Sequence, residues 1–410
     1  MRTFTAPALL TVSALLALGC GQAEAPENAE GASAPADYEE SLRLALESAQ
    51  PGDVITVPPG THGFTRSLTL NVDGVTIRGA GMNESVLTFA DQVAGAEGLL
   101  VNASDFTIED VGLEDTVGDA LKINEGRNIV IRRVRTEWTN GPDTENGAYG
   151  VYPVQTENTL IDGVVAIGAS DAGIYVGQSR NVVVKNSRAE YNVAGIEIEN
   201  TVNADVHDNV ARNNTGGILV FNMPDLPQLG HSTRVFDNEV SDNNTDNFGA
   251  PGSAVAGVPA GTGIIINSND KVEIFDNRIG GNKTANVLIS SAFSAEYSAE
   301  RDTASTFDPY PETIYIYGNT FGAGGTAPDR EELDVLRRSV FGDDGSLPDI
   351  VWDGVVDPGK ADQGPALCIE GDATFVNVDA ANGYQNPSTD LAPHDCRHEK
   401  LSGVELAVGR

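Results

Sequence analysis

The chain contains few basic residues and few residues that bind soft metals. Of its 410 residues, 25 are Lys or Arg and 60 are Asp or Glu, which gives a formal charge of −35. A field this negative repels phosphate backbones, so nucleic acid is not an expected partner. With 5 His, 3 Met and 3 Cys, the composition also disfavours a copper-handling role.

Long apolar runs are equally scarce. The run Ala6–Leu18 follows a positively charged start, is too short to span a bilayer as a helix, and ends in small residues. Residues 1–19 are therefore predicted to be a signal peptide. The sequence Leu16–Cys20 resembles a bacterial lipobox, in which the cysteine becomes the acylated first residue. The alternative is an ordinary secretory signal with a chance cysteine.

The segment after the signal indicates how the protein is held in the cell envelope. Residues 20–37 are rich in Ala, Glu, Pro and Ser, and we expect them to form a flexible acidic tether. Its lipid would be attached to Cys20. Gly21 stands where an Asp would favour retention in the inner membrane, so the expected location is the outer membrane.

Glycines that open short apolar runs recur at a nearly constant interval. Gly150, Gly173, Gly195 and Gly217 are 23, 22 and 22 residues apart, with a second β-branched run between them. Such a period with two-residue alternation predicts a solenoid of strands, and the leucine-rich-repeat pattern is absent. We therefore expect an all-β fold, a right-handed parallel β-helix with about three short strands per coil, over residues 38–325.

The ends of this solenoid need protection, because exposed parallel edges aggregate. Residues 38–50 have the apolar spacing of a capping helix, and residues 326–410 are expected to form a C-terminal cap. In an exported chain, a disulfide between Cys368 and Cys396 is the default. The alternative is a metal site at His394-x-Cys396-x-His398.

Asparagines also recur at one aligned position after the second strand of a coil. Stacked asparagines there can bond to the backbone of turns that a sheet would leave open. These residues are Asn209, Asn238, Asn277 and Asn319.

Four stretches of the repeat, Asn146–Gln155, Gly168–Ser179, Ala189–Asn200 and Asn213–Asn222, carry a more specific pattern. They resemble the bacterial parallel β-helix repeat-containing lipoprotein family, of the carbohydrate-binding and sugar-hydrolase type. The similarity runs from about Tyr38 to about Ile289. It implies a lipoprotein with a right-handed β-helix and a frequent pairing with an exported c-type-cytochrome-like protein. It implies no agreed activity.

Outward side chains at one register position stack along a β-helix at about 4.8 Å, so a site is a line of residues across neighbouring strands. Aligning the glycines places one mixed line of tyrosines and acids on a single face. The candidate catalytic residues are Lys122, Tyr175, Glu197 and Glu199. The candidate binding residues are Asp119, Tyr152, Asp171, Phe221 and Asn267.

These residue types suit sugar chemistry, since sugar rings stack on aromatic faces while carboxylates accept hydroxyl protons. A Tyr or Lys beside a neutralised uronate would give lyase or epimerase activity, whereas the pair Glu197 and Glu199 would suit glycoside hydrolysis. Calcium is a further possibility, with Asp119, Asp171, Glu197 and Glu199 as oxygen ligands. The plain alternative is that tyrosines and charges cover a solvated sheet.

The sequence thus predicts an exported, lipid-anchored β-helix protein that binds envelope or extracellular polysaccharide, and it leaves open whether the protein also processes that polysaccharide. Two rivals remain. One is a non-catalytic partner of an exported cytochrome-like protein, and the other is a structural surface protein. A groove on the tyrosine and acid face would favour the glycan, and a flat face would favour the protein partner.

Overall fold

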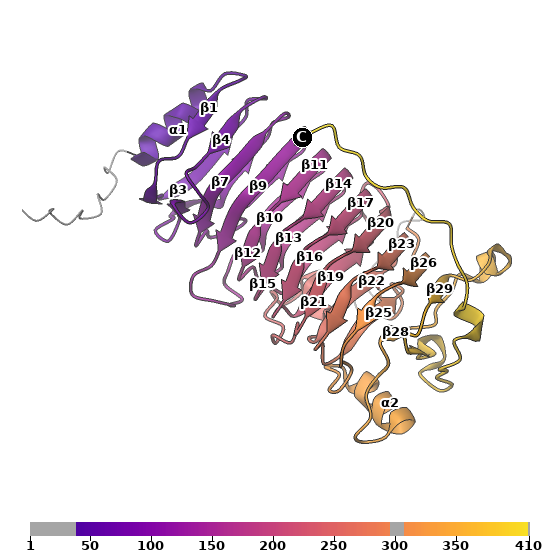
Figure 1. Cartoon of the computed structure of the whole chain (residues 1–410). Helices are drawn as coiled ribbons and strands as arrows, with labels where there is room; N and C mark the ends of the chain where they lie inside the picture. Colours follow the sequence, from indigo (N-terminus) through magenta and orange to yellow (C-terminus); the bar gives the residue numbers. More distant parts are fainter. Residues whose placement is uncertain (1–37, 296–306, 409–410) are drawn as a thin grey trace, which may run out of the picture. The chain divides into compact units, whose positions relative to one another are not determined.

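A computed structural model describes residues 38–295 and 307–408 of the chain (Figure 1). The predicted signal peptide, Cys20 and the tether lie outside these residues. Within them the chain winds as a stack of parallel coils, as the repeats predict, and each full coil contributes strands to three walls.

The first wall is a separate sheet in which every strand pairs in parallel with the next coil. Its strands are β3 (Arg66–Leu70), β6 (Ala94–Val101), β8 (Leu121–Asn124), β10 (Tyr149–Val154), β13 (Ala172–Gly177), β16 (Ala194–Glu199), β19 (Gly216–Phe221), β22 (Thr262–Asn267), β25 (Ala285–Ser290), β28 (Ile350–Trp352) and β30 (Phe375–Asn377).

The second and third walls are joined into one sheet, because the long strands β7 and β9 run through both. The second wall contains β1 (Val54–Thr56), β4 (Thr76–Arg78), β7 (Thr107–Glu114), β9 (Arg127–Glu137), β11 (Glu157–Asp162), β14 (Arg180–Lys185), β17 (Val202–His207), β20 (His231–Phe236), β23 (Asp270–Phe275), β26 (Glu312–Tyr317) and β29 (Leu367–Glu370). The third wall adds β2 (Gly60–Gly63), β5 (Ser85–Thr88), β12 (Val165–Ile167), β15 (Arg188–Glu190), β18 (Val210–Arg212), β21 (Glu239–Ser241), β24 (Arg278–Gly280) and β27 (Thr320–Phe321).

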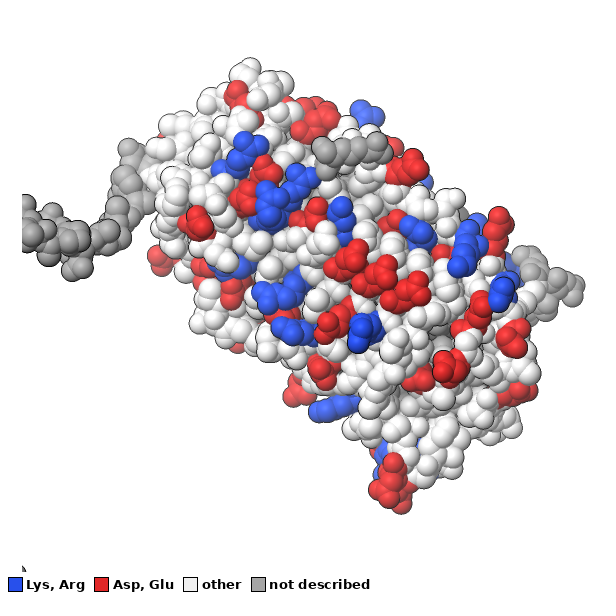
Figure 2. All heavy atoms as spheres, viewed as in Figure 1, with Lys and Arg blue, Asp and Glu red and all other residues white. Residues whose placement is uncertain are grey.

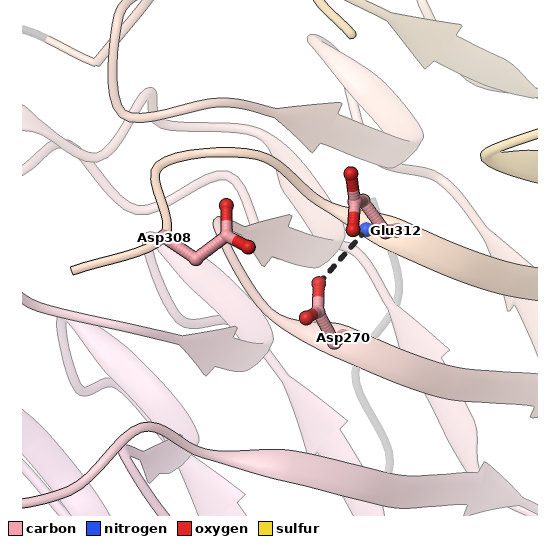
Figure 3. Close-up of side chains that lie close together, drawn as sticks. All are labelled: Asp270, Asp308 and Glu312. Carbon is pink, nitrogen blue, oxygen red and sulfur yellow. Dashed lines mark hydrogen bonds between the residues drawn. The ribbon is translucent and has the colours of Figure 1, made fainter. Parts of the chain in front are cut away.

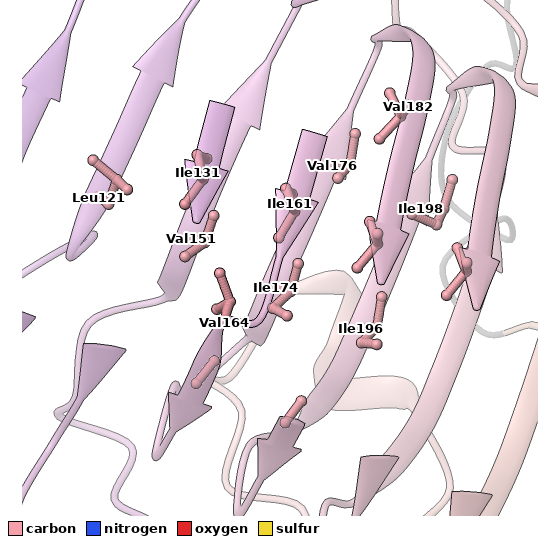
Figure 4. Packing of buried hydrophobic residues seen from close by; sticks show 14 of the residues in the cluster. Leu121, Ile131, Val151, Ile161, Val164, Ile174, Val176, Val182, Ile196 and Ile198 are labelled. Carbon is pink, nitrogen blue, oxygen red and sulfur yellow. The ribbon is translucent and has the colours of Figure 1, made fainter. Parts of the chain in front are cut away.

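The inward side chains of all three walls fill one continuous apolar core (Figure 4). The residues that follow the repeated glycines, among them Val151, Ile174, Ile196 and Ile218, are fully buried in it. This confirms the predicted inward set. Because inward and outward positions alternate along a strand, the burial of these residues also shows which neighbouring residues of the first wall point outward.

Buried asparagines join the coils at two turns. The Asn238 side-chain oxygen accepts hydrogen bonds from the backbone and side-chain nitrogens of Asn209, both at 3.0 Å, and Asn238 bonds Asn277 in the same way. This confirms the predicted set. A second set, which the sequence analysis missed, is formed by Asn192, Asn214, Asn243 and Asn282.

Both ends of the solenoid are covered. Helix α1 (Tyr38–Ser48) buries Leu42 and Leu46 against the first coil. At the other end the stacking continues past the predicted boundary at residue 325, because β28, β29 and β30 still pair in parallel with the walls. The remaining elements are helix α2 (Glu331–Phe341) and the short 3-10 helices η1 (Ala254–Gly257), η3 (Pro358–Gln363), η4 (Ala380–Asn382) and η5 (Ala392–His394).

The C-terminal tail runs back over the outside of the second wall (Figure 1). It is attached where Cys396 forms a disulfide with Cys368 of β29, with sulfurs 2.05 Å apart. The bond occupies the thiol of the alternative metal site, so that alternative is not supported. Figure 2 shows acidic side chains interspersed with fewer basic ones on the face in view. In the described part of the chain, no helix is both long enough and apolar enough to cross a membrane.

Candidate functional site

The outward side of the first wall carries the predicted residues in the predicted register. Tyr152 pairs with Lys122, and Tyr175 pairs with Glu197, so these side chains form one line across β8, β10, β13 and β16. Two residues further along β16, Glu199 starts a second line. We call the resulting group the acid–tyrosine site. It comprises Asp119, Lys122, Tyr149, Tyr152, Asp171, Tyr175, Glu197 and Glu199.

The three tyrosines form a compact aromatic cluster. The ring centroids of Tyr149 and Tyr152 are 4.3 Å apart, those of Tyr149 and Tyr175 are 4.7 Å apart, and those of Tyr152 and Tyr175 are 4.9 Å apart. Two hydroxyls donate to acids. Tyr149 bonds Asp171 Oδ2 at 3.3 Å and Tyr175 bonds Glu199 Oε1 at 2.6 Å. The tyrosines therefore hold two carboxyl groups in place.

Glu197 is the most deeply placed of the acids. Its side chain lies between Tyr175 and Leu219 on the neighbouring strands, and the residue is 2% exposed. Within the described residues, its Oε2 atom has no hydrogen-bond partner. Burial, together with the negative charges of Asp171 and Glu199, raises the pKa of Glu197 well above its usual value. This environment therefore favours the protonated, uncharged form of Glu197.

Asp171 and Glu199 are the partly exposed acids beside it. Burial and the charge of Glu199 raise the pKa of Asp171 to about 7, against the opposing effect of the Tyr149 hydrogen bond. Burial also raises the pKa of Glu199, while hydrogen bonds from Tyr175 and Gln178 act in the opposite direction. The pKa values of both carboxyl groups are thus raised above their usual values, to about 7 in the case of Asp171.

The tyrosines cannot easily serve as bases in this setting. Burial raises the pKa of Tyr152 to about 12. The pKa values of Tyr149 and Tyr175 are also raised, by burial and then by the nearby acids. All three phenols keep their protons at neutral pH. The proton abstraction that the sequence analysis considered for Tyr175 is therefore disfavoured, and its role here is to donate a hydrogen bond.

Lys122 supplies the positive charge at one edge of the site. Its Nζ lies 3.5 Å from Asp119 and 3.8 Å from Glu97, and 4.9 Å from the centroid of the Tyr152 ring. Burial raises the pKa of Asp119, and the Lys122 charge opposes that shift.

The long loop between β21 and β22 packs on this wall. Its residues Val255 and Val258 form an outer apolar cluster with Leu219, Ile265 and Tyr175. The Asn247 amide holds the loop by donating to the backbone oxygens of residues 255 and 258. The face is therefore walled on one side rather than flat.

A pocket of about 330 Å³ continues the same face toward the C-terminal coils. Phe221 pairs with Glu199 on one side and with Asn267 on the other, so the pocket begins one strand beyond the acid–tyrosine site. Two of the five predicted binding residues, Phe221 and Asn267, line it, together with Ser290 and Asp353. Asp353, which the sequence analysis missed, is buried and accepts hydrogen bonds from Ser291 and Ser294.

The four acids suggested as calcium ligands do not form a set that could share one ion. Among the residues that the structure describes, a cluster of three carboxylates close enough together to share one ion lies elsewhere, at Asp270, Asp308 and Glu312 (Figure 3). Lys360 places its ammonium 2.8 Å from Asp308 and also bonds Glu312. The Lys360 side chain therefore already supplies a positive charge to this cluster.

Comparison with known proteins identifies the fold. Residues 97–256 match the family model described as right handed beta helix region. The chain has 18% identity to the A-module of mannuronan C-5 epimerase AlgE4 of Azotobacter vinelandii, with a TM-score of 0.54 over 77% of this chain and 87% of that one. The AlgE6 A-module of the same organism has 18% identity and a TM-score of 0.49 over 77% and 84% of the two chains.

A relative was also found by sequence. The pre-neck appendage protein of Bacillus phage B103 is 25% identical over 219 residues, which cover 44% of this chain. The chain matches only 25% of that protein's length. Together with the stacked parallel strands, these likenesses show that the protein is a right-handed parallel β-helix, as the repeats predict.

Proposed function

We propose that the acid–tyrosine site binds a polysaccharide and cleaves a glycosidic bond with Asp171 and Glu199 as proton-exchanging groups. One observation carries this proposal. Two partly exposed carboxyl groups, each held by a tyrosine hydroxyl, stand beside the buried acid Glu197 on a walled face. General acid–base catalysis needs groups that titrate near the working pH, and Asp171 has a pKa raised to about 7.

The roles differ from those expected from the sequence. Glu197 is too deeply buried to meet a sugar oxygen directly, so we assign it the task of keeping a proton next to the other two acids. Asp171, expected only to bind, takes the acid–base position with Glu199. Tyr152 and Phe221 offer apolar surface on which sugar rings can pack. Asn267 lies in the pocket that would hold the next sugar unit.

Hydrolysis is favoured over lyase or epimerase chemistry. Removing the proton beside a uronate carboxyl requires a base and a cation that neutralises the uronate. The phenols keep their protons, and Lys122 is already engaged with Asp119 and Glu97. The AlgE4 module shares the fold and by its name acts on a polysaccharide, which supports a glycan ligand without identifying the reaction. The walled face argues against the flat docking surface that a protein partner would need.

The test is turnover by the purified chain carrying Cys20→Ala, so that no lipid is attached. A panel of neutral, amino and uronate oligosaccharides would be incubated with it, and products measured by mass spectrometry. Glu199→Gln should lower the cleavage rate by about 100-fold, within the range of general acid–base effects. Glu157→Gln, at an exposed position of the second wall, should have no effect. Binding and cleavage of no glycan in the panel would contradict the proposal.

We also propose that the chain is exported and lipid-anchored through Cys20 in the outer membrane. A disulfide such as Cys368–Cys396 persists in oxidising compartments, which supports export. Growth of an expressing bacterium with a labelled fatty acid tests this. Label should enter the protein in the outer-membrane fraction and should be lost with Cys20→Ala. Unlabelled protein in the cytoplasm would overturn the proposal.

A further inference from the structure

The acid–tyrosine site contains more carboxyl groups than basic groups. Among residues 38–295 and 307–408, the basic group that opposes the raised pKa of a carboxyl there is Lys122, and it acts on Asp119. The causes of the shifted pKa values of Asp171 and Glu199 are burial, the charges of Glu199 and Asp119 in the case of Asp171, and hydrogen bonds from Tyr149, Tyr175 and Gln178. Asp171 accepts a hydrogen bond from the Tyr149 hydroxyl, and Glu199 accepts hydrogen bonds from Tyr175 and Gln178; all three donors are uncharged.

A second observation points to a ligand at the same place. Glu197 is 2% exposed, and its Oε2 has no hydrogen-bond partner among the described residues. Leaving a buried polar atom without a partner costs the folded state free energy, and in native proteins such atoms need a reason. A positive group bound between Asp171 and Glu199 would relieve the repulsion between negative charges that contributes to the raised pKa values of Asp171 and Glu197.

The tyrosine cluster already shows which kind of cation it accepts. The Lys122 ammonium lies 4.9 Å from the centroid of the Tyr152 ring while it is shared with Asp119. Aromatic rings combined with carboxylates bind ammonium groups through cation–π attraction and charge-assisted hydrogen bonds. Tyr175 and Glu199 likewise combine an aromatic ring with a carboxyl group, joined by the hydrogen bond from the Tyr175 hydroxyl.

We propose that the polysaccharide bound at this site carries protonated amines, as a polymer of amino sugars with free amino groups does, and that an ammonium of the ligand lies between Asp171 and Glu199. This inference rests on the proposed function of the same site. A uronate polymer would instead bring carboxylates next to these acids in a chain whose formal charge is −35, and like charges at short range repel. An N-acetylated polymer would meet the acids without a charge to neutralise them.

The experiment compares three probes of equal length at about pH 6: a glucosamine hexamer, the same hexamer fully N-acetylated, and a mannuronate hexamer. Isothermal titration calorimetry in two buffers of different ionisation enthalpy gives both affinity and the protons exchanged. The glucosamine hexamer should bind at least about tenfold more tightly than the N-acetylated one and should release protons, because the ammonium lowers the carboxyl pKa values. Mannuronate should bind most weakly.

Variants separate the site from the general negative charge of the protein. Asp171→Asn and Glu199→Gln should each reduce the ratio of the two affinities, glucosamine hexamer over N-acetylated hexamer, and should reduce the proton release. Glu157→Gln removes one charge elsewhere and should change neither. An amine preference that survives Asp171→Asn with Glu199→Gln, equal binding of the two hexamers, or tighter binding of mannuronate would overturn the inference. Absence of binding by every probe would instead count against the proposed function itself.

Discussion

Tyr175 donates its hydroxyl to Glu199 Oε1 at 2.6 Å, from one strand of the first wall to the next. This bond depends on a glycine two residues after the tyrosine. A Cβ at Gly177 would lie 2.4 Å from the Tyr175 hydroxyl, so the absence of a side chain there leaves room for the ring. Glu199 and Gly177 occupy the same register position in consecutive coils. The residue at this position in the earlier coil must therefore have no side chain.

The first prediction is that Gly177→Ala disables the site without unfolding the protein. The added methyl group displaces the Tyr175 ring and removes the hydrogen bond to Glu199. Losing a hydrogen bond to an ionisable group costs about 1.5–3 kcal/mol, so affinity for the preferred glycan should fall about tenfold or more, and calorimetry measures it. Tyr175→Phe should give a similar loss. Gly63→Ala, where a Cβ meets nothing within 4 Å, is the matched control.

The second prediction is that the protein is more stable at mildly acidic pH than at neutral pH. Burial raises the folded-state pKa of Asp171 and of Asp270 from 3.8 to about 7. An acid whose folded pKa is raised favours folding while it is protonated. That contribution is complete below about pH 4 and is lost as the pH rises through about 7, at about 1.4 kcal/mol per pKa unit.

Thermal unfolding followed by circular dichroism between about pH 4 and pH 8 measures this effect. The midpoint should fall across that range in the parent protein. Asp171→Asn and Glu197→Gln should each flatten the decline, because the amide cannot ionise, whereas exposed Glu157→Gln should leave it unchanged. A midpoint that rises from pH 5 to pH 7 would contradict the assignment of raised pKa values to the acid–tyrosine site.

The sequence was sufficient for the fold and for the register of the first wall. Each coil repeats the same glycine-led pattern, so inward Ile174 and Ile196 and outward Tyr175 and Glu197 could be aligned by counting. Counting works there because strands β13, β16 and β19 pair residue by residue without a shift, unlike β3 and β6, and alternation then decides which side each residue faces.

Tyr149 was missed for a local reason. Strict alternation from Val151 would point it inward. However, a Cβ at Gly150 would lie 2.5 Å from Thr136 Oγ1 and from the backbone oxygen of Gly173. Residue 150 therefore faces the neighbouring backbone, and alternation is broken just where Tyr149 turns outward to meet Tyr152 and Tyr175.

The burial of individual side chains, and their contacts with residues far away in the sequence, could not be predicted either. The loop that carries Val255 and Val258 covers Tyr175 and Leu219, the neighbours of Glu197 on the adjacent strands, and no periodicity describes how a loop folds back. The coils beyond residue 325 escaped notice because β28 and β30 are short and are separated by long irregular connections. For that reason Asp353, which lines the pocket, was not aligned with Ser290 of the preceding coil.

The third prediction concerns the buried asparagines. Asn238 donates to the backbone oxygen of Val206 and to Asn277, and accepts from both nitrogens of Asn209. Asn238→Ala leaves several buried polar groups without partners, each costing about 1–3 kcal/mol. The unfolding free energy in urea should therefore fall by about 3 kcal/mol or more. Asn140→Ala, at an exposed turn, should change it by less than about 0.5 kcal/mol. Equal effects of the two substitutions would show that the stacked amides are not stabilising.

The fourth prediction is that the C-terminal tail acts as a strap that holds neighbouring coils together. Val404, Leu406 and Val408 pack on Val130, Leu160 and Val183, an outward apolar line on the second wall. Deleting residues 401–410 uncovers that line.

The strap also makes polar contacts with the same wall. The backbone nitrogens of Leu401 and Val404 donate to Glu273 and to Asp205, both at 2.9 Å. Arg234, between these two acids in the register, bonds Asp205 at 2.8 and 2.6 Å. The tail thus makes both apolar and polar contacts with the second wall. Such complementary contacts are expected of a segment that packs specifically on the wall.

Truncation should lower the unfolding free energy by about 1–3 kcal/mol, the scale of burying two or three partly covered aliphatic side chains less the cost of ordering the tail. It should also increase the fluorescence of an apolar dye that binds exposed hydrophobic surface. Leu406→Ser should produce part of both effects. Glu405→Ala, on the exposed side of the tail, should produce neither, and a truncated protein with unchanged stability and dye binding would show that the strap does not support the coils beneath it.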